Sequence, residues 1–244
     1  MFPVVRARNE SSSLIREAIG SEMIPAALIL AAGMSRRTAP MNKLLHPVSF
    51  DSRVPMLAAV VDRFLATVAR PLVVVVGKNA DNIRDALDGR PVSFAINPFP
   101  EEGLSGSIRV GLAALPAEAP AVLIGLGDMP LISSKTIMRL ISLYQTHPEA
   151  HIVAPVYRGR RGHPVLWDRR FFPALTALTG DRGGRDLINR HLGSLRLAPI
   201  EDSGVVTDFD SLDDFQQHAT FSDKIFVDTD VVKENHDPRQ EQSR

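Results

Sequence analysis

Small and positively charged residues directly follow an aliphatic segment near the start of the chain. Residues 29–43 read ILAAGMSRRTAPMNK, so Gly33 and Ser35 come just after the apolar run, with Arg37 and Lys43 beyond them. Gly33 and Ser35 let the backbone turn tightly and expose successive N–H groups that can bind an anion. Arg37 and Lys43 could bind a polyphosphate from two sides. The alternative is an ordinary loop with solvated arginines, because the segment is neither a P-loop nor a full G-x-G-x-x-G fingerprint.

Acidic residues follow two later apolar segments. Asp128 belongs to GLGDMP, and Asp208 and Asp210 belong to TDFD. Mg²⁺ is commonly held by one or two carboxylates together with phosphate oxygens, so these aspartates are candidate metal ligands. Asp128 could also be a simple turn former. The histidines show no zinc-ligand spacing, and the absence of cysteine excludes disulfides and thiol nucleophiles.

A second loop of small residues, EEGLSGSIRVGL, lies between these regions. It places Gly103, Ser105, Gly106 and Ser107 before an expected helix. In open α/β sheets, ligands bind beyond the carboxyl ends of the strands. Two small-residue loops, a pair of cations and several carboxylates would meet at that edge. This convergence favours a nucleotide site over a purely structural role for each segment.

The elements that must position these residues follow from the apolar pattern. The expected strands are residues 24–32, 71–77, 92–97 and 121–130. The expected helices between and after them are residues 54–69, 81–87, 107–115 and 135–147, the last capped by Ser133 or Ser134. Unbroken apolar strands that alternate with helices are typical of a parallel sheet covered on both faces. The sequence therefore predicts an α/β fold.

The pattern becomes mixed beyond residue 150. An apolar segment at 151–157 precedes the Gly- and Arg-rich RGRRGHP, which we interpret as a loop or a β-ribbon over the sheet, and helices are expected at 168–178 and 185–192. We expect residues 23–220 to form one domain. Residues 1–22 would be a flexible, dispensable extension and residues 221–244 a polar, disordered tail, because both are rich in charged and polar residues.

Composition limits the classes of function. The 244 residues include 28 Lys plus Arg and 28 Asp plus Glu, so the formal net charge is zero. This balance gives no indication of nucleic-acid binding or of attachment to an anionic membrane, and any phosphate must be held by local charge. The apolar stretches are too short to span a bilayer, and the N-terminus lacks the apolar core of a secretory signal. A cytoplasmic protein is expected.

Six segments, in order, resemble the MobA-like nucleotidyltransferases, and most closely the molybdenum cofactor cytidylyltransferases. They are LAAGMSRR with Lys43, EGLSGSIRVGL, GLGDMPLI, RGHPVLW, LTGDRGGRDLI and TDFDSLDDF, and the resemblance extends from about residue 24 to about residue 218. It implies a Rossmann-like nucleotidyltransferase fold with a mostly parallel sheet. It also implies transfer of CMP from CTP to molybdopterin, with Mg²⁺ as the cofactor and pyrophosphate as the leaving group.

The resemblance implies roles for individual residues. The nucleotide would be held by two loops, whose residues are Leu30, Ala31, Ala32, Gly33 and Ser35 in the first and Gly103, Ser105 and Gly106 in the second. Arg37 and Lys43 would bind the triphosphate and act in catalysis with Asp128, while Asp128 and Asp208 would hold Mg²⁺.

The acceptor would be contacted by His163, Asp181 and Arg182, although an ordinary hairpin is the alternative for the His163 segment. Ala32 stands where guanylyl-transferring relatives have glycine, so CTP is favoured over GTP.

Three other functions stay open. The same chemistry could act on a sugar phosphate or an alcohol phosphate, because acceptor loops vary more than nucleotide sites. A catalytically idle protein could instead carry cofactor to a molybdoenzyme or a maturation factor. Its main support is Ala39, which stands where the family commonly has glycine. A nicotinamide- or flavin-dependent oxidoreductase would lack the second and third glycines of the dinucleotide fingerprint.

Overall fold

The computed structural model describes residues 23–33, 42–48, 53–77, 80–181, 183–210 and 214. Several sequence-based expectations concern residues outside these ranges. They are the expectations for the extension 1–22, the tail 221–244, Ser35, Arg37, Ala39 and Arg182.

Four parallel strands form one half of the sheet. β1 (Ala26–Ala31) pairs with β2 (Leu72–Val76) on one side and with β4 (Ala121–Leu126) on the other, and β3 (Ser93–Ile96) pairs with β2. Every residue of β1 and β2 is buried, which explains the unbroken apolar runs that predicted them. The expected α/β fold with a mostly parallel sheet is confirmed.

The other half of the sheet is mixed. β7 (Val165–Asp168) is inserted antiparallel between β4 and β5 (Ile152–Tyr157), β6 (Arg160–Arg161) forms a hairpin with β5, and β8 (Leu195–Pro199) pairs parallel with β5. This hairpin falls in RGRRGHP, for which a loop or a β-ribbon was expected and an ordinary hairpin was the alternative. The sequence did not predict β7 or β8, since β7 is only four residues long and β8 has a single buried residue.

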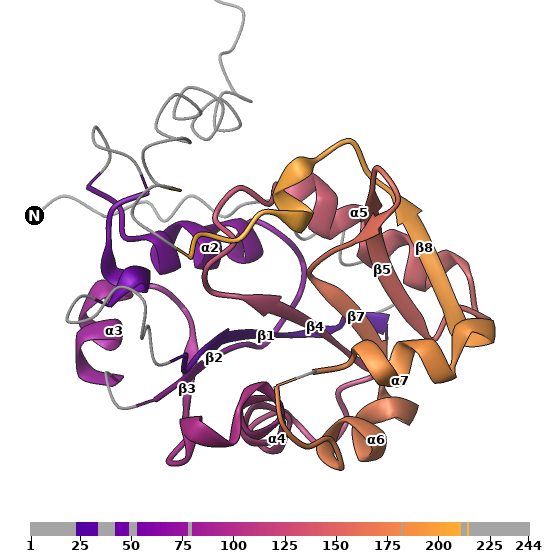
Figure 1. The fold of residues 1–244 in the computed structure, drawn as a ribbon, viewed down its shortest axis with the longest axis horizontal. Coiled ribbons are helices and arrows are strands. Elements are labelled where there is room, and N and C mark those ends of the chain that lie inside the picture. Colours follow the sequence, from indigo (N-terminus) through magenta and orange to yellow (C-terminus); the bar gives the residue numbers. More distant parts are fainter. Residues whose placement is uncertain are drawn as a thin grey trace, which may run out of the picture.

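Helices cover both faces of the sheet, and Figure 1 shows α2 and α5 on one side and α4 and α6 on the other. The first core contains side chains of α2 (Met56–Leu65), α3 (Ala80–Ala86) and α5 (Ser134–Thr146). The second contains side chains of α4 (Leu104–Ala113), α6 (Phe172–Thr176) and α7 (Arg185–Arg190).

Short 3₁₀ turns join these elements; they are η2 (Lys43–Leu45), η3 (Pro100–Glu102), η4 (Arg169–Phe171), η5 (Leu192–Ser194) and η6 (Ser203–Val206). Ser133 caps α5 by accepting a hydrogen bond from the Thr136 N–H, as one of the two expected caps. Among the described residues, no helix combines the length and the apolar character needed to cross a bilayer.

Candidate active site

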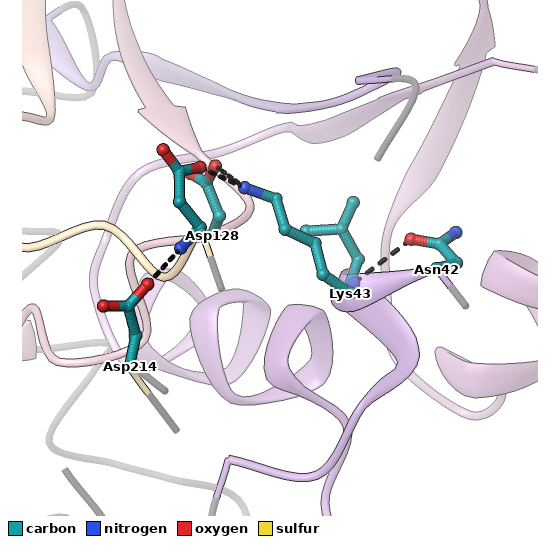
Figure 2. Close-up of polar contacts among 6 residues, drawn as sticks. Asn42, Lys43, Asp128 and Asp214 are labelled. Carbon is teal, nitrogen blue, oxygen red and sulfur yellow. Dashed lines mark hydrogen bonds and ion pairs between the residues drawn. The ribbon is translucent and has the colours of Figure 1, made fainter. Parts of the chain in front are cut away.

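The ammonium group of Lys43 lies between two carboxylates at the carboxyl edge of the sheet. Its Nζ donates to Asp128 Oδ2 and to Asp210 Oδ1, both at 2.8 Å, and Figure 2 shows the Lys43 side chain directed at Asp128. Only 14% of the Lys43 side chain is exposed. Burial alone would lower the pKa of Lys43, but its charge interactions and hydrogen bonds with Asp128 and Asp210 outweigh burial and raise this pKa above its usual value. Lys43 is therefore a fixed positive charge at neutral pH.

The backbone around Lys43 is held on both sides. Asn42 caps η2, because its side-chain oxygen accepts a hydrogen bond from the Leu44 N–H at 3.1 Å (Figure 2). Leu44 is buried in the core between the sheet and α2. These two contacts fix the backbone position of Lys43. The position of its ammonium group then depends on the rotamer of its four-carbon side chain.

The segment that carries Asp208 and Asp210 is attached to the loop after β4. The Phe209 N–H donates to the Asp128 carbonyl at 3.0 Å, and the Phe209 side chain is fully buried. The Asp210 N–H donates to Asp214 Oδ2 at 2.8 Å. Asp210 is thereby directed at Lys43, whereas Asp208 is exposed. The expected metal pair, Asp128 and Asp208, thus lies on two neighbouring segments.

Asp202 anchors the same region, and sequence reasoning missed it. Its Oδ2 accepts hydrogen bonds from the Ser133 N–H and the Thr136 hydroxyl at 2.9 and 2.7 Å, and its Oδ1 accepts one from the Gly204 N–H at 2.9 Å. Any Cβ at Gly204 would overlap the backbone of Leu131. Asp202 therefore ties η6, and the aspartates after it, to the loop that follows Asp128.

A cavity of about 1050 Å³ lies on the side of the sheet covered by α4, α6 and α7. Apolar and polar surface share its walls about equally. The apolar part includes the indole of Trp167 and is formed by Leu30, Leu104, Ile108, Ile124, Leu126, Val165, Trp167, Leu175 and Ile188. Polar lining comes chiefly from Arg160, Arg161, His163, Asp181, Arg185 and Asp186. Arg161 donates to the side chain of Asn189, while Arg160 and Arg185 have no ion-pair partner among the described residues.

His163 links the cavity to the aspartates. It lines the cavity, its backbone N–H donates to the Val205 carbonyl at 2.8 Å, and its buried Nδ1 has no hydrogen-bond partner among the described residues. Burial lowers the pKa of His163, although a hydrogen bond to the Ile124 backbone and the charges of Asp128 and Asp208 act in the opposite direction. His163 is therefore neutral at pH 7, lies within reach of the charges of Asp128 and Asp208, and has an unused polar atom, Nδ1.

The second small-residue loop, which begins at Gly103, is in contact with Asp181. Gly103 has φ 85°, and a Cβ there would overlap the Asp181 carboxylate. Asp181 Oδ1 accepts a hydrogen bond from the Leu104 N–H at 3.2 Å, so Asp181 caps α4, which has no other side-chain cap. Ser105 is buried, and its hydroxyl has no partner among the described residues. The expected acceptor residue Asp181 thus lines the cavity while it also caps the helix of the expected nucleotide loop.

The first loop begins at the end of β1. Leu30 lines the cavity, and its carbonyl accepts a hydrogen bond from the Gly127 N–H at 3.0 Å. Ala31 and Ala32 are buried, whereas Gly33 is exposed with open space around its Cα. The structure therefore brings the start of this loop, Asp128 and His163 to one edge of the sheet. Gly106 lies within α4, next to Glu102 and Asn97.

Comparisons with known proteins show the family and the fold. The family described as MobA-like NTP transferase domain matches residues 27–195. Bifunctional protein GlmU of Cupriavidus necator is 37% identical over 116 residues, which are 47% of this chain and 24% of that protein, so the chain spans about a quarter of the length of that relative.

Two solved structures resemble the whole described domain. Rv0371c from Mycobacterium tuberculosis H37Rv is 26% identical, with a TM-score of 0.71 over 81% of this chain and 97% of that one. A structure of Rv0371c in complex with manganese has a TM-score of 0.67 at 25% identity, over 81% of this chain and 98% of that one.

Proposed function

Because the chain belongs to the MobA-like NTP transferase domain family, we propose that it transfers CMP from CTP to molybdopterin and releases pyrophosphate. Nucleotidyl transfer is the activity of the family; the base of the donor and the identity of the acceptor are the proposal. The observation that carries it is the Lys43–Asp128 ion pair just beyond the end of β4, the strand whose Ile124 and Leu126 line a large cavity with arginines among its polar residues.

The cavity supports a flat, anionic acceptor. The apolar part of the wall, with the indole of Trp167, suits a ring system, and the polar part suits the charged group attached to it. Arg160 and Arg185 are available to bind a phosphate group, for which guanidinium is well suited. His163 would contact the acceptor from the side nearest Asp128. Ala32, by the family resemblance, supports CTP over GTP as donor.

The reaction needs positioning and charge neutralisation rather than a general base. A phosphate oxygen of the acceptor attacks the α-phosphorus of CTP, the bond to the β-phosphate oxygen breaks, and pyrophosphate leaves. The acceptor phosphate is already largely ionised near neutral pH. Lys43 would bind the triphosphate, with Arg37, and stabilise the charge that develops on the leaving group.

Two carboxylates together with phosphate oxygens would suit a hard divalent cation; among the described residues, no three acidic, histidine or cysteine side chains form a metal site by themselves. Asp128, Asp208 and Asp210 offer only carboxylate oxygens, which Mg²⁺ prefers, and Asp128 already holds one cation, the ammonium of Lys43. We assign Mg²⁺ to Asp128 and Asp208, which lie on neighbouring segments, and assign Asp210 to Lys43. The complex of Rv0371c with manganese supports a divalent cation in this fold. When bound, the ion neutralises phosphate charge.

Pyrophosphate release tests the proposal. The purified protein would be incubated with each of the four ribonucleoside triphosphates and Mg²⁺, with molybdopterin, with a sugar phosphate, and without acceptor. Release with CTP and molybdopterin alone supports the proposal. Release with a sugar phosphate would assign another acceptor, and no release under any condition would favour an idle carrier of cofactor. A cytoplasmic location and a molybdoenzyme or maturation-factor partner stay predictions.

A further inference from the structure

The Lys43 ammonium is bonded to the same carboxylate that the proposed metal would bind. Nζ lies 2.8 Å from Asp128 Oδ2, and Asp210 binds the same ammonium from the other side at 2.8 Å. We infer that Lys43 is an exchangeable internal cation: it neutralises Asp128 in the nucleotide-free protein and moves to the nucleotide phosphates when the metal is loaded. The inference rests on the proposed metal and nucleotide site.

Electrostatics makes the two cations compete. Two carboxylates that converge on one point repel each other, and the Lys43 ammonium offsets that repulsion. A divalent ion at Asp128 would then face a positive charge held a hydrogen-bond length from the same carboxylate. Because this edge of the sheet is only partly exposed to water, that repulsion is weakly screened. Metal and ammonium therefore disfavour each other at Asp128.

The local structure allows Lys43 to move without unfolding. Asn42 and Leu44 fix the backbone of η2, so the ammonium can change partners by rotation of its own stem. Its other partner, Asp210, is held by Asp214 and stays in place as a second anchor. The triphosphate of the donor would supply a third anion, beside the loop after β1.

This exchange couples two binding events. Metal alone must displace Lys43 from Asp128 with no new anion to receive the ammonium, so it binds weakly. A bound triphosphate receives the ammonium and leaves Asp128 to the metal. Nucleotide and metal then strengthen each other's binding, which is a reciprocal coupling. The prediction concerns binding and can be tested without turnover.

The first test measures Mn²⁺ affinity of the nucleotide-free protein by electron paramagnetic resonance. Lys43→Met keeps the length of the side chain and removes its charge, and it should tighten Mn²⁺ binding by about tenfold or more. Lys43→Arg keeps the charge and should stay close to wild type. Asp128→Asn should weaken binding in the wild-type and Lys43→Met backgrounds alike. Mn²⁺ binding to Lys43→Met no tighter than to wild type would overturn the inference.

A second test makes its measurement on the wild-type chain and uses a variant only to assign the signal. The chain has only five lysines, so ε-¹³C-lysine labelling gives few resonances, and the Lys43 signal is the one lost in Lys43→Arg. Mg²⁺ with a non-hydrolysable CTP analogue should shift that signal, whereas the same Mg²⁺ concentration alone should not. No shift with both ligands would overturn the inference. If both tests succeed while no pyrophosphate is released, the exchange stands and the proposed transfer fails.

Discussion

The backbone N–H of Phe209 donates to the carbonyl of Asp128 at 3.0 Å, which joins two segments that are far apart in the sequence. Through this bond, the pair Asp208 and Asp210 is brought to the end of β4, where Lys43 also arrives from η2. The acidic cluster of the site is therefore assembled by backbone contacts, and its side chains stay available to cations.

Asp128→Asn should abolish most turnover and leave the fold intact. The side chain lies at a strand end, the change is nearly isosteric, and Lys43 retains Asp210 as a partner. Loss of one of two metal carboxylates should reduce the Mg²⁺-dependent rate by about a hundredfold or more. The check is pyrophosphate release at saturating Mg²⁺, together with the melting temperature. Wild-type turnover in this variant would remove Asp128 from the metal site.

Lys43→Met should slow turnover even though it tightens metal binding. The lost charge would otherwise stabilise the leaving pyrophosphate, so kcat/KM should fall by roughly 10²–10³-fold, as for other electrostatic stabilisers. Steady-state kinetics with varied CTP would measure this, with Lys43→Arg as the matched variant that retains the charge. A change in melting temperature with unchanged kinetics would make Lys43 a structural residue.

Asp208 and Asp210 should behave differently, although only Phe209 separates them. Asp208→Asn removes an assigned metal ligand and should weaken Mn²⁺ binding by about tenfold or more. Asp210→Asn removes the second anchor of Lys43 and one negative charge, but no assigned metal ligand, so it should weaken Mn²⁺ binding less than Asp208→Asn does. Titration of both variants with Mn²⁺ in the absence of nucleotide compares them directly. If Asp210→Asn weakened Mn²⁺ binding more than Asp208→Asn, Asp210 and not Asp208 would be the metal ligand.

Asp202→Ala should destabilise the fold. The substitution removes the acceptor of three hydrogen bonds. The Ser133 and Gly204 N–H groups then lack their acceptor, which should lower the free energy of unfolding by about 1–3 kcal/mol. The melting temperature should fall by several degrees. Asp81→Ala, at a carboxylate that is 91% exposed, is the control and should change it little. Equal effects of the two substitutions would show that Asp202 is not an anchor.

The stability of the protein should depend on His163 between pH 7.5 and 5. Burial lowers the pKa of His163 in the folded state below its value of 6.5 in the unfolded chain. The unfolded chain therefore binds more protons below pH 6.5, so the contribution of His163 is present above that pH and is lost as the pH falls. Urea unfolding of wild type and His163→Gln would show a flatter pH dependence in the variant. Identical pH profiles would contradict this account.

The central strands could be predicted from the sequence because burial on both faces requires unbroken apolar runs, as in β1 and β2. β8 could not, since four of its five residues keep some exposure and it depends on pairing with β5. Lys43 and Asp128 were recognisable one by one from their types and their positions after strands. Their direct contact was not, because it depends on how η2 and the loop after β4 meet in space.

Two other features of the site also needed the structure. Asp202 had no signal beyond an acidic residue before Ser203 and Gly204, and its partners Ser133 and Thr136 lie in another part of the sequence. Asp181 was predicted as an acceptor contact, but its use as the cap of α4 depends on the approach of its loop to Gly103.

Transfer of a radioactive label from CTP is the most direct test of CMP transfer to molybdopterin. The protein would be incubated with Mg²⁺, molybdopterin and CTP labelled with ³²P at either the α- or the γ-phosphate, and the products would be separated. We expect the α-label in the molybdopterin product and the γ-label in pyrophosphate. Absence of the α-label from molybdopterin, or its transfer only to a sugar phosphate, would contradict CMP transfer to molybdopterin.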